Sequence, residues 1–308
     1  MNVANIFITG YSLNLTEIST EEDFNDALDQ LENFFENGAT YNNVEVCNDY
    51  LTYDLGGETL RDLIYEISGF SDPQYTELLK ELSYVVRGKV QNTLSDVALA
   101  SSGAGPVWNG EFIGFYSQGK IIPLVLNELI VTNSDSLFEL NYKNLGVYPI
   151  SEKSFSDRAQ LIFDNISYHH NFESTLSTVV SGDFKSYSIE FARSLKILHD
   201  SFPKLTSKGH NPPDLDIIRC ESGIAGRAMD CTVQGSNKAL LCNKSFDIKL
   251  IDGKQHHIAS LNCEYHLKIN HDNNGKRLSK RFYNRAYFGL PLINGKKYIA
   301  LYHLGKHY

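Results

Sequence analysis

Long apolar segments are missing from this chain. No run of eighteen or more apolar residues occurs, so no stretch has the composition of a transmembrane helix. The N-terminus, from Met1 to Phe7, has neither the basic flank nor the long apolar stretch of a secretory signal. We therefore expect a cytoplasmic protein that has no membrane partner.

Cysteine is scarce, odd in number and widely spaced. The five cysteines are Cys47, Cys220, Cys231, Cys242 and Cys263. This pattern favours reduced thiols over a disulfide framework. The equal spacing of Cys220, Cys231 and Cys242 leaves a zinc site as an alternative, but the close C-x-x-C or C-x-x-H pairs of such sites are absent. We expect no metal and no cofactor.

Basic residues are rare in the front half of the chain. Residues 1–150 hold 22 Asp and Glu against 6 Lys and Arg, whereas residues 253–308 hold 2 against 10, within a net charge of −9. This asymmetry predicts that the basic end contacts phosphates. The acidic front is compatible with docking to a partner, with imitation of nucleic acid, or with a merely solvated surface.

The length and composition predict more than one folded module. A chain of 308 residues with 42% apolar and 21% charged content accommodates two or three globular units. Residues 19–38 have the capping pattern and the 3.6-residue apolar spacing of a helix. We expect an α+β protein: a mixed, helix-prominent acidic domain at 1–150, a helical connector at 151–207, and a basic, β-rich antiparallel domain at 208–308.

Strand-like patterns occur in both terminal domains. In the front domain, residues 108–115, 120–126 and 128–132 are candidates for an antiparallel sheet. The candidates at the other end are residues 217–220, 239–242, 246–251, 258–269, 282–290 and 297–304. Asn294-Gly295 between apolar alternations is a strong hairpin signal. We expect the last three segments to pair as an antiparallel meander.

Polar side chains alternate along the first two strands of this expected meander. The two-residue period places Glu264, His266 and Lys268 on one face of the first strand. In the second strand, Arg285 and Tyr287 share a face. Pairing of the strands would bring these five side chains together on one surface.

The third strand and the loop between the first two add further basic and aromatic groups. The alternation sends Tyr302 to one face and His303 to the other, and Gly305 permits a twist after them. Exposed cations can contact phosphates, and exposed tyrosines can stack on unpaired bases. The expected nucleic-acid-binding residues are Lys276, Arg277, Lys280, Arg281, Tyr287, Tyr302 and Lys306.

This set of side chains suits the cleavage of RNA. A base removes the proton of the ribose 2′-hydroxyl, cations stabilise the charge on the phosphoryl oxygens, and an acid protonates the leaving oxygen. The expected roles are general base for Glu264 or His266, phosphate stabiliser for Lys268 and Arg285, and general acid for His303 or His307.

Two other interpretations of the same residues remain open. Polar residues on one face of a terminal sheet are often only its solvent side. A metal site formed by Cys263, His266 and His303 is a second alternative, although Cys263 and His266 are expected on opposite strand faces.

The closing pattern resembles that of a known toxin family. The order is E-x-H-x-K on a strand, then R-x-Y-F, then Y-H-L-G-K-H. It resembles RelE-type and barnase-like ribonuclease toxins over about the last fifty residues. The resemblance implies Glu, His, Lys, Arg and Tyr side chains on a small antiparallel sheet. It also implies that the preceding residues regulate, target or inhibit.

The leading hypothesis is a toxin-like or antiviral defence effector of the cytosol. Its basic C-terminal domain would bind RNA and cleave it as a metal-independent ribonuclease, a hydrolase. The alternative is a non-catalytic component of a larger complex, which binds nucleic acid or protein while the acidic N-terminal domain docks to a partner.

Overall fold

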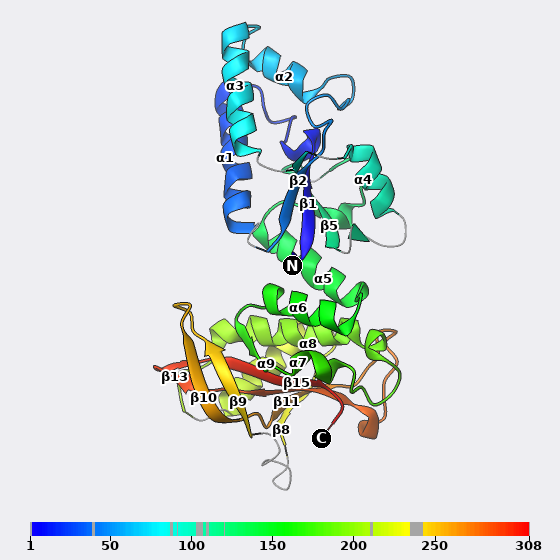
Figure 1. Ribbon diagram of the computed structural model, residues 1–308, viewed down its shortest axis with the longest axis vertical. Helices are drawn as coiled ribbons and strands as arrows, with labels where there is room; N and C mark the ends of the chain where they lie inside the picture. Colours follow the sequence, from blue (N-terminus) through cyan, green and yellow to red (C-terminus); the bar gives the residue numbers. More distant parts are fainter. Residues whose placement is uncertain are drawn as a thin grey trace. The chain divides into compact units, whose positions relative to one another are not determined.

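The computed structural model describes residues 2–38, 41–86, 89–90, 92–102, 107–108, 111–119, 121–209, 212–234 and 243–307. The chain divides into two compact units, Met1–Asn144 and Leu145–Tyr308 (Figure 1). Both contain helices and β-sheets, and the expected α+β class is confirmed.

The first unit is built around a mostly parallel sheet. Its helices are α1 (Glu21–Gly38), α2 (Leu60–Ile67), α3 (Asp72–Val85), α4 (Leu94–Ser101) and α5 (Ser134–Val147), the last of which runs on past Asn144. Its strands are β1 (Ala4–Ile8), β2 (Asn43–Val46), β3 (Lys89–Val90), β4 (Val107–Trp108), β5 (Glu111–Tyr116) and β6 (Ile130–Val131). The strand order is β3-β2-β1-β5-β4, with β6 also paired to β5. Only the β4–β5 pair is antiparallel among these described strands.

The expectation of an antiparallel sheet in the front domain was therefore wrong. Strand β5 lies parallel to β1, and residues 121–126 form turns instead of a strand. Strand β1 is buried along its whole length, as is usual for parallel strands that are covered on both faces. An apolar run of this kind does not reveal strand direction, which here is set by the helical connections.

Helix α1 forms close to where its capping pattern predicts. The reciprocal cap joins Thr20 and Asp23: the Thr20 Oγ1 accepts from the Asp23 amide at 3.1 Å, and the Asp23 carboxylate accepts from the Thr20 amide at 2.9 Å. The apolar stripe of the helix is buried, with Phe24, Leu28 and Leu31 at its centre.

The second unit combines helices with an antiparallel meander. Its helices are α6 (Glu152–Ile162), α7 (Phe172–Leu176), α8 (Ser188–Ser201) and α9 (Pro212–Ile224). Its strands are β7 (Ile166–Tyr168), β8 (Cys231–Val233), β9 (Asn243–Lys249), β10 (Gln255–Asn262), β11 (Tyr265–Ile269), β12 (Asn284–Gly289), β13 (Leu292–Ile293), β14 (Lys296–Lys297) and β15 (Ile299–Gly305). The main sheet has the order β7-β15-β12-β11-β8, so the expected meander of β11, β12 and β15 is present.

Residues 151–207 lie within this unit, where the sequence indicated a connector. Strand β7 pairs in parallel with β15, and the Thr175 hydroxyl of α7 accepts a hydrogen bond from the Leu304 amide at 3.1 Å. Residues 151–207 thus belong to the same folded unit as the C-terminal strands.

The first strand expected in the 208–308 region is a helix. Residues 217–220, expected as a strand, belong to helix α9, because Leu215, Ile218 and Ser222 recur at helical spacing and are buried. Residues 239–242, the other early strand candidate, lie outside the described residues.

The two faces of the main sheet pack differently. Leu267, Ala286 and Leu304 occupy one face and are fully buried. Helices α6 to α9 lie together on one side of the sheet in Figure 1. On the face that bears Ala300, the β9–β10 hairpin packs through Phe246. A Cβ on Gly289 would lie 2.9 Å from the Asn262 carbonyl oxygen, so this hairpin closely covers one end of the face.

Candidate functional site

A row of polar side chains crosses four strands of the main sheet. The register aligns Thr232 of β8 with His266 of β11, His266 with Tyr287 of β12, and Tyr287 with His303 of β15. A β-bulge between β12 and β15 adds one residue to β15. Because the bulge reverses the alternation, His303 and Ala300 share a face, whereas simple alternation placed them on opposite faces.

Several polar side chains of this surface contact the hydroxyl of Tyr287. It donates to the Gln234 Oε1 at 3.2 Å and accepts from the Arg285 Nη1 at 3.2 Å, and it lies 3.4 Å from the His307 Nδ1. The Arg285 Nη1 also reaches the Gln234 Oε1 at 3.2 Å. We call Gln234, His266, Arg285, Tyr287 and His307 the polar cluster.

Arg285 carries a positive charge that no described carboxylate neutralises. Among the described residues, its hydrogen-bond partners are neutral oxygens, and its buried Nε has no partner. A guanidinium in such surroundings is well suited to a phosphate, whose oxygens accept two of its N–H groups together.

Two of the histidines are buried and neutral at physiological pH. Burial, together with the charge of Arg285, lowers the pKa of His266 to about 3, and its Nε2 lies 3.0 Å from the Thr232 hydroxyl. Burial lowers the pKa of His303 to about 4, and its Nε2 donates to the Lys306 carbonyl at 2.8 Å. A histidine that remains neutral is a poor general acid. Of the two acids that the sequence offered, the geometry favours His307, which is only half-buried.

Lys268 and Glu264 lie at the border of the cluster. The Lys268 Nζ forms an ion pair of 2.6 Å with Asp230, so its charge is already shared. Glu264 is half-buried, and its carbonyl oxygen accepts from the Gln234 amide at 2.8 Å. The backbone of Glu264 thus adjoins the cluster.

The residues expected to bind nucleic acid do not all lie together. Lys276, Arg277, Lys280 and Arg281 are exposed in the loop between β11 and β12, and Lys306 is exposed after β15. The two tyrosines of this set differ in exposure. Tyr287 is fully buried, so its ring offers no face to a base. Tyr302 lies near the β9–β10 hairpin, with the Lys244 Nζ 4.6 Å from its ring centre.

The metal site considered for Cys263, His266 and His303, all of which the structure describes, is not formed. No group of three or more His, Cys, Asp or Glu side chains in the described part of the chain is arranged to hold a metal ion. Cys263 packs in the apolar cluster beneath the β9–β10 hairpin. Cys242, of the equally spaced trio, lies outside the described residues.

Sequence reasoning missed the contribution of β8. Thr232 and Gln234 alternate with the buried Cys231 and the exposed Val233, and Asp230 precedes them. The alternation covers too few residues to predict a strand. The histidines of the C-terminal segment made that segment the more obvious candidate. Without β8, the cluster would lack the amide oxygen that both Arg285 and Tyr287 contact.

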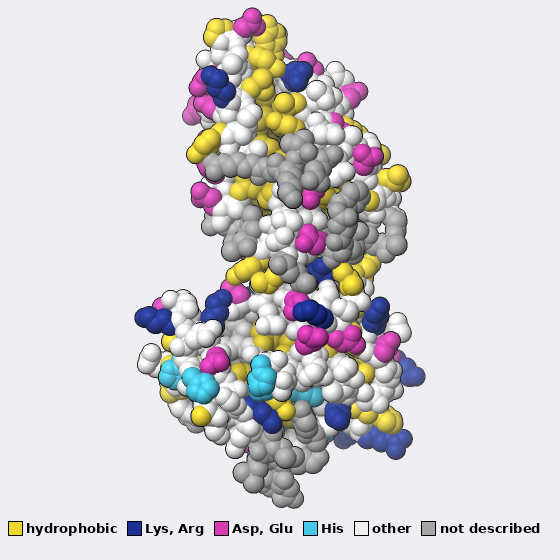
Figure 2. All heavy atoms as spheres, in the orientation of Figure 1, with side chains coloured by type: hydrophobic (Ala, Val, Ile, Leu, Met, Phe, Trp, Pro, Cys, Tyr) yellow, Lys and Arg dark blue, Asp and Glu magenta, His cyan; other side chains and the backbone are white. Residues whose placement is uncertain are grey.

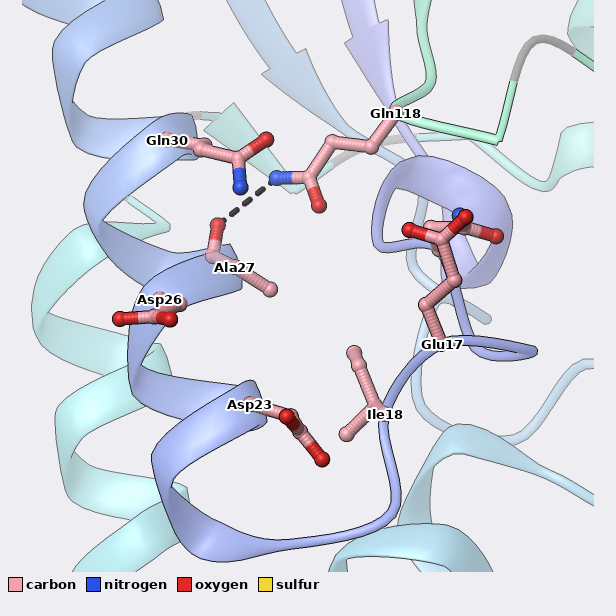
Figure 3. A pocket seen from close by; sticks show the side chains of 8 residues that line it. Glu17, Ile18, Asp23, Asp26, Ala27, Gln30 and Gln118 are labelled. Atoms are coloured by element: carbon pink, nitrogen blue, oxygen red, sulfur yellow. Dashed lines mark hydrogen bonds between the residues drawn. The ribbon is translucent and has the colours of Figure 1, made fainter.

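The first unit contains a separate polar pocket of about 210 Å³. It lies between the segment after β1, the beginning of α1, and Gln118 after β5 (Figure 3). The Gln118 Nε2 donates to the Ala27 carbonyl at 2.7 Å across this pocket. Its charged lining residues are all acidic: Glu17, Asp23 and Asp26. These charges disfavour phosphate, so the pocket and the polar cluster suit ligands of opposite charge.

Comparisons with protein-family models, with curated proteins and with solved structures find no match for this chain. In the described residues, no helix is both long and apolar enough to span a membrane.

Proposed function

We propose that the second unit binds single-stranded RNA at the polar cluster and cleaves it with its own side chains. The supporting observation is Arg285, a partly buried guanidinium beside Tyr287 and His307 with no carboxylate partner among the described residues. Such a group favours an anion that is itself partly removed from water, as a phosphodiester in the cluster would be.

The proposed reaction is an intramolecular transfer at phosphorus. The ribose 2′-oxygen forms a bond to the adjacent phosphorus, its proton passes to the Glu264 carboxylate, and the bond from phosphorus to the 5′-oxygen breaks. His307, in its protonated form, gives a proton to the departing 5′-oxygen. The products are a 2′,3′-cyclic phosphate and a 5′-hydroxyl, and Arg285 stabilises the charge that gathers on the phosphoryl oxygens.

The two buried histidines support this arrangement without transferring protons. His266 fixes Thr232 and packs beside the Tyr287 ring, with ring centres 5.1 Å apart. His303 holds the backbone of Lys306, and so fixes the turn that presents His307. The roles first expected for His266 and His303 thus become positioning roles.

Cleavage of labelled RNA in the presence of a chelator tests the proposal. Relative to the wild type, Arg285→Gln and His307→Gln should each lower kcat by roughly 10²- to 10³-fold, the range for loss of a charge stabiliser or a general acid. Arg61→Gln in the first unit and His256→Gln on β10 are exposed controls that should leave the rate unchanged. Wild-type rates in both site variants would rule out the proposed roles.

A specific observation favours a second candidate, RNA binding without cleavage. Tyr287, His266 and His303 are at most 2% exposed, which is more usual for a structural network than for groups that touch substrate. This candidate predicts RNA binding that yields no products and does not change in His307→Gln. For the cleaving protein we propose the role of a toxin-like or defence effector that acts on RNA.

A further inference from the structure

The loop between β11 and β12, residues 270–283, is fastened to helix α8 by one side chain. We call this segment the basic loop. The Asn273 Oδ1 accepts from the Ile189 amide at 3.0 Å, its Nδ2 donates to the Lys185 carbonyl at 2.6 Å, and its own amide donates to the Ser186 carbonyl at 2.9 Å. Tyr187, the N-cap residue that precedes α8, makes no side-chain capping hydrogen bond. Asn273 therefore caps the helix from 84 residues further along the chain.

The tip of the basic loop lies close to Arg227. Gly275 has φ of +77°, and a Cβ placed on it would lie 3.2 Å from the Arg227 Nη1. Arg227 in turn lies 3.4 Å from the carboxylate of Glu190, a buried residue of α8 that also pairs with Arg193. The turn at Gly275 thus lies next to the Arg227 guanidinium, which pairs with the Glu190 carboxylate of α8.

The outer surface of the basic loop is cationic. Lys276, Arg277, Lys280 and Arg281 are exposed, and no ion pair to any of them occurs among the described residues. The Arg281 guanidinium lies 4.6 Å from the ring centre of Phe282. Figure 2 shows lysine and arginine side chains gathered at the edge of the second unit, where Figure 1 draws the end of the chain.

The basic loop begins where the polar cluster ends. Strands β11 and β12 lead directly into it, and the last cross-strand pairs before it are Lys268 with Arg285 and Ile269 with Asn284. A polynucleotide held at Arg285 can therefore extend along the loop. A dinucleotide has a single internucleotide phosphate, so none remains for the loop when that phosphate lies at Arg285.

We infer that the basic loop is a preformed binding site for the phosphates of an RNA strand that extends beyond the polar cluster. Asn273 is the residue that positions this phosphate-binding loop. The inference rests on the proposed function for the cluster and names its substrate as a strand, not a short fragment. A loop that is already ordered loses little conformational entropy on binding, so Asn273 contributes to affinity without touching the RNA.

Binding of a fluorescent single-stranded RNA at several salt concentrations tests whether the basic loop binds phosphates. Replacing Lys276, Arg277, Lys280 and Arg281 together by Ala should reduce the slope of log affinity against log salt by about 3, near 0.7 for each phosphate contact. Because these side chains are exposed, the variant should fold. An unchanged salt slope would overturn the proposal that the basic loop binds phosphates.

The positioning role of Asn273 needs a variant that leaves the charge unchanged. Asn273→Ala should raise KM for long RNA by roughly three- to tenfold and leave kcat on a dinucleotide substrate unchanged. Asn274→Ala, at the exposed neighbour, is the matched control and should match the wild type. Gly275→Ala disturbs the same loop through its positive φ and its contact with Arg227, and should reproduce the rise in KM.

The binding experiment separates the two proposals. In one outcome, the wild type binds RNA in a salt-dependent way, the four-residue variant loses this binding, and the wild type cleaves nothing. This outcome supports phosphate binding by the basic loop and contradicts the catalytic role. Cleavage by the wild type together with wild-type affinity and KM in Asn273→Ala contradicts the positioning role and leaves the catalytic proposal intact.

Discussion

Tyr287 illustrates at the residue scale why a strand pattern identifies a site residue but not its role. The alternation with Arg285 was enough to place both on one surface. It gave no indication that β8 and the C-terminal turn would enclose the tyrosine ring. Its hydroxyl, not its ring, is therefore the part of the side chain available for chemistry.

Removing this hydroxyl should be costly for the fold. Tyr287→Phe leaves the Gln234 Oε1 and the Arg285 Nη1 with one partner fewer in a buried setting, which typically costs about 1–3 kcal/mol. Urea denaturation of the second-unit transition measures the loss. Tyr65→Phe, at a partly exposed tyrosine of α2, should change stability by less than about 0.5 kcal/mol. Equal stability of both variants would contradict the importance of the network.

At the scale of elements, the sequence predicted what local patterns determine. The first helix, the β11–β12–β15 meander and the turn at Asn294-Gly295 follow from capping, two-residue alternation and turn chemistry. The β-bulge in β15 has no such local signal, because it depends on how two strands pair. It decides which face His303 occupies, and so decides part of the site.

Helix α9 was mistaken for a strand because four apolar-rich residues are ambiguous on their own. Its structural role depends on a distant partner: Asp214 forms an ion pair with Lys297 of β14, and both side chains are fully buried. Only the fold brings together two residues that lie 83 positions apart. A buried pair of this kind fixes the helix against the sheet.

Breaking that pair should destabilise the second unit strongly. Asp214→Asn leaves the Lys297 ammonium buried without its carboxylate, which is expected to cost about 3–5 kcal/mol. Asp252→Asn removes an ion pair to Lys254 that is largely exposed, and should cost at most about 1 kcal/mol. Chemical denaturation compares the two. Similar losses in both variants would show that burial of the pair has little energetic effect.

At the scale of the whole molecule, three histidines of the second unit link its stability to pH. Burial lowers the pKa of His169 to about 4, that of His266 to about 3 and that of His303 to about 4. Their ordinary pKa is 6.5, so between about pH 6.5 and 4 the unfolded chain binds more protons than the folded one. Stability is therefore complete above pH 6.5 and falls as the pH is lowered through this range.

The acid sensitivity should be visible in the free energy of unfolding between pH 7 and pH 5. Each of these histidines contributes up to about 1.4 kcal/mol per pH unit. Replacing His303 by Gln should lower the slope by up to about 1.4 kcal/mol per pH unit, whereas His256→Gln, at an exposed position on β10, should leave the slope unchanged. A slope in His303→Gln that equals the wild-type slope would contradict the assignment of one of these protons to His303.

Charge segregation is the molecule-wide property that the sequence predicted most directly. The first unit offers an acidic pocket, and the second offers an arginine without a carboxylate partner among the described residues, next to a basic loop. Composition alone predicted this contrast. It could not locate Arg285 beside Gln234 and Tyr287, because that arrangement depends on four strands in register.

The chemical nature of the RNA ends tests the central claim most directly. Single-stranded RNA incubated with the purified full chain in chelator should yield fragments that carry a 2′,3′-cyclic phosphate and a 5′-hydroxyl, and Arg285→Gln should form them roughly 10²- to 10³-fold more slowly. Intact RNA that remains bound to the wild-type protein, or fragments that the Arg285→Gln variant produces equally well, would contradict the account.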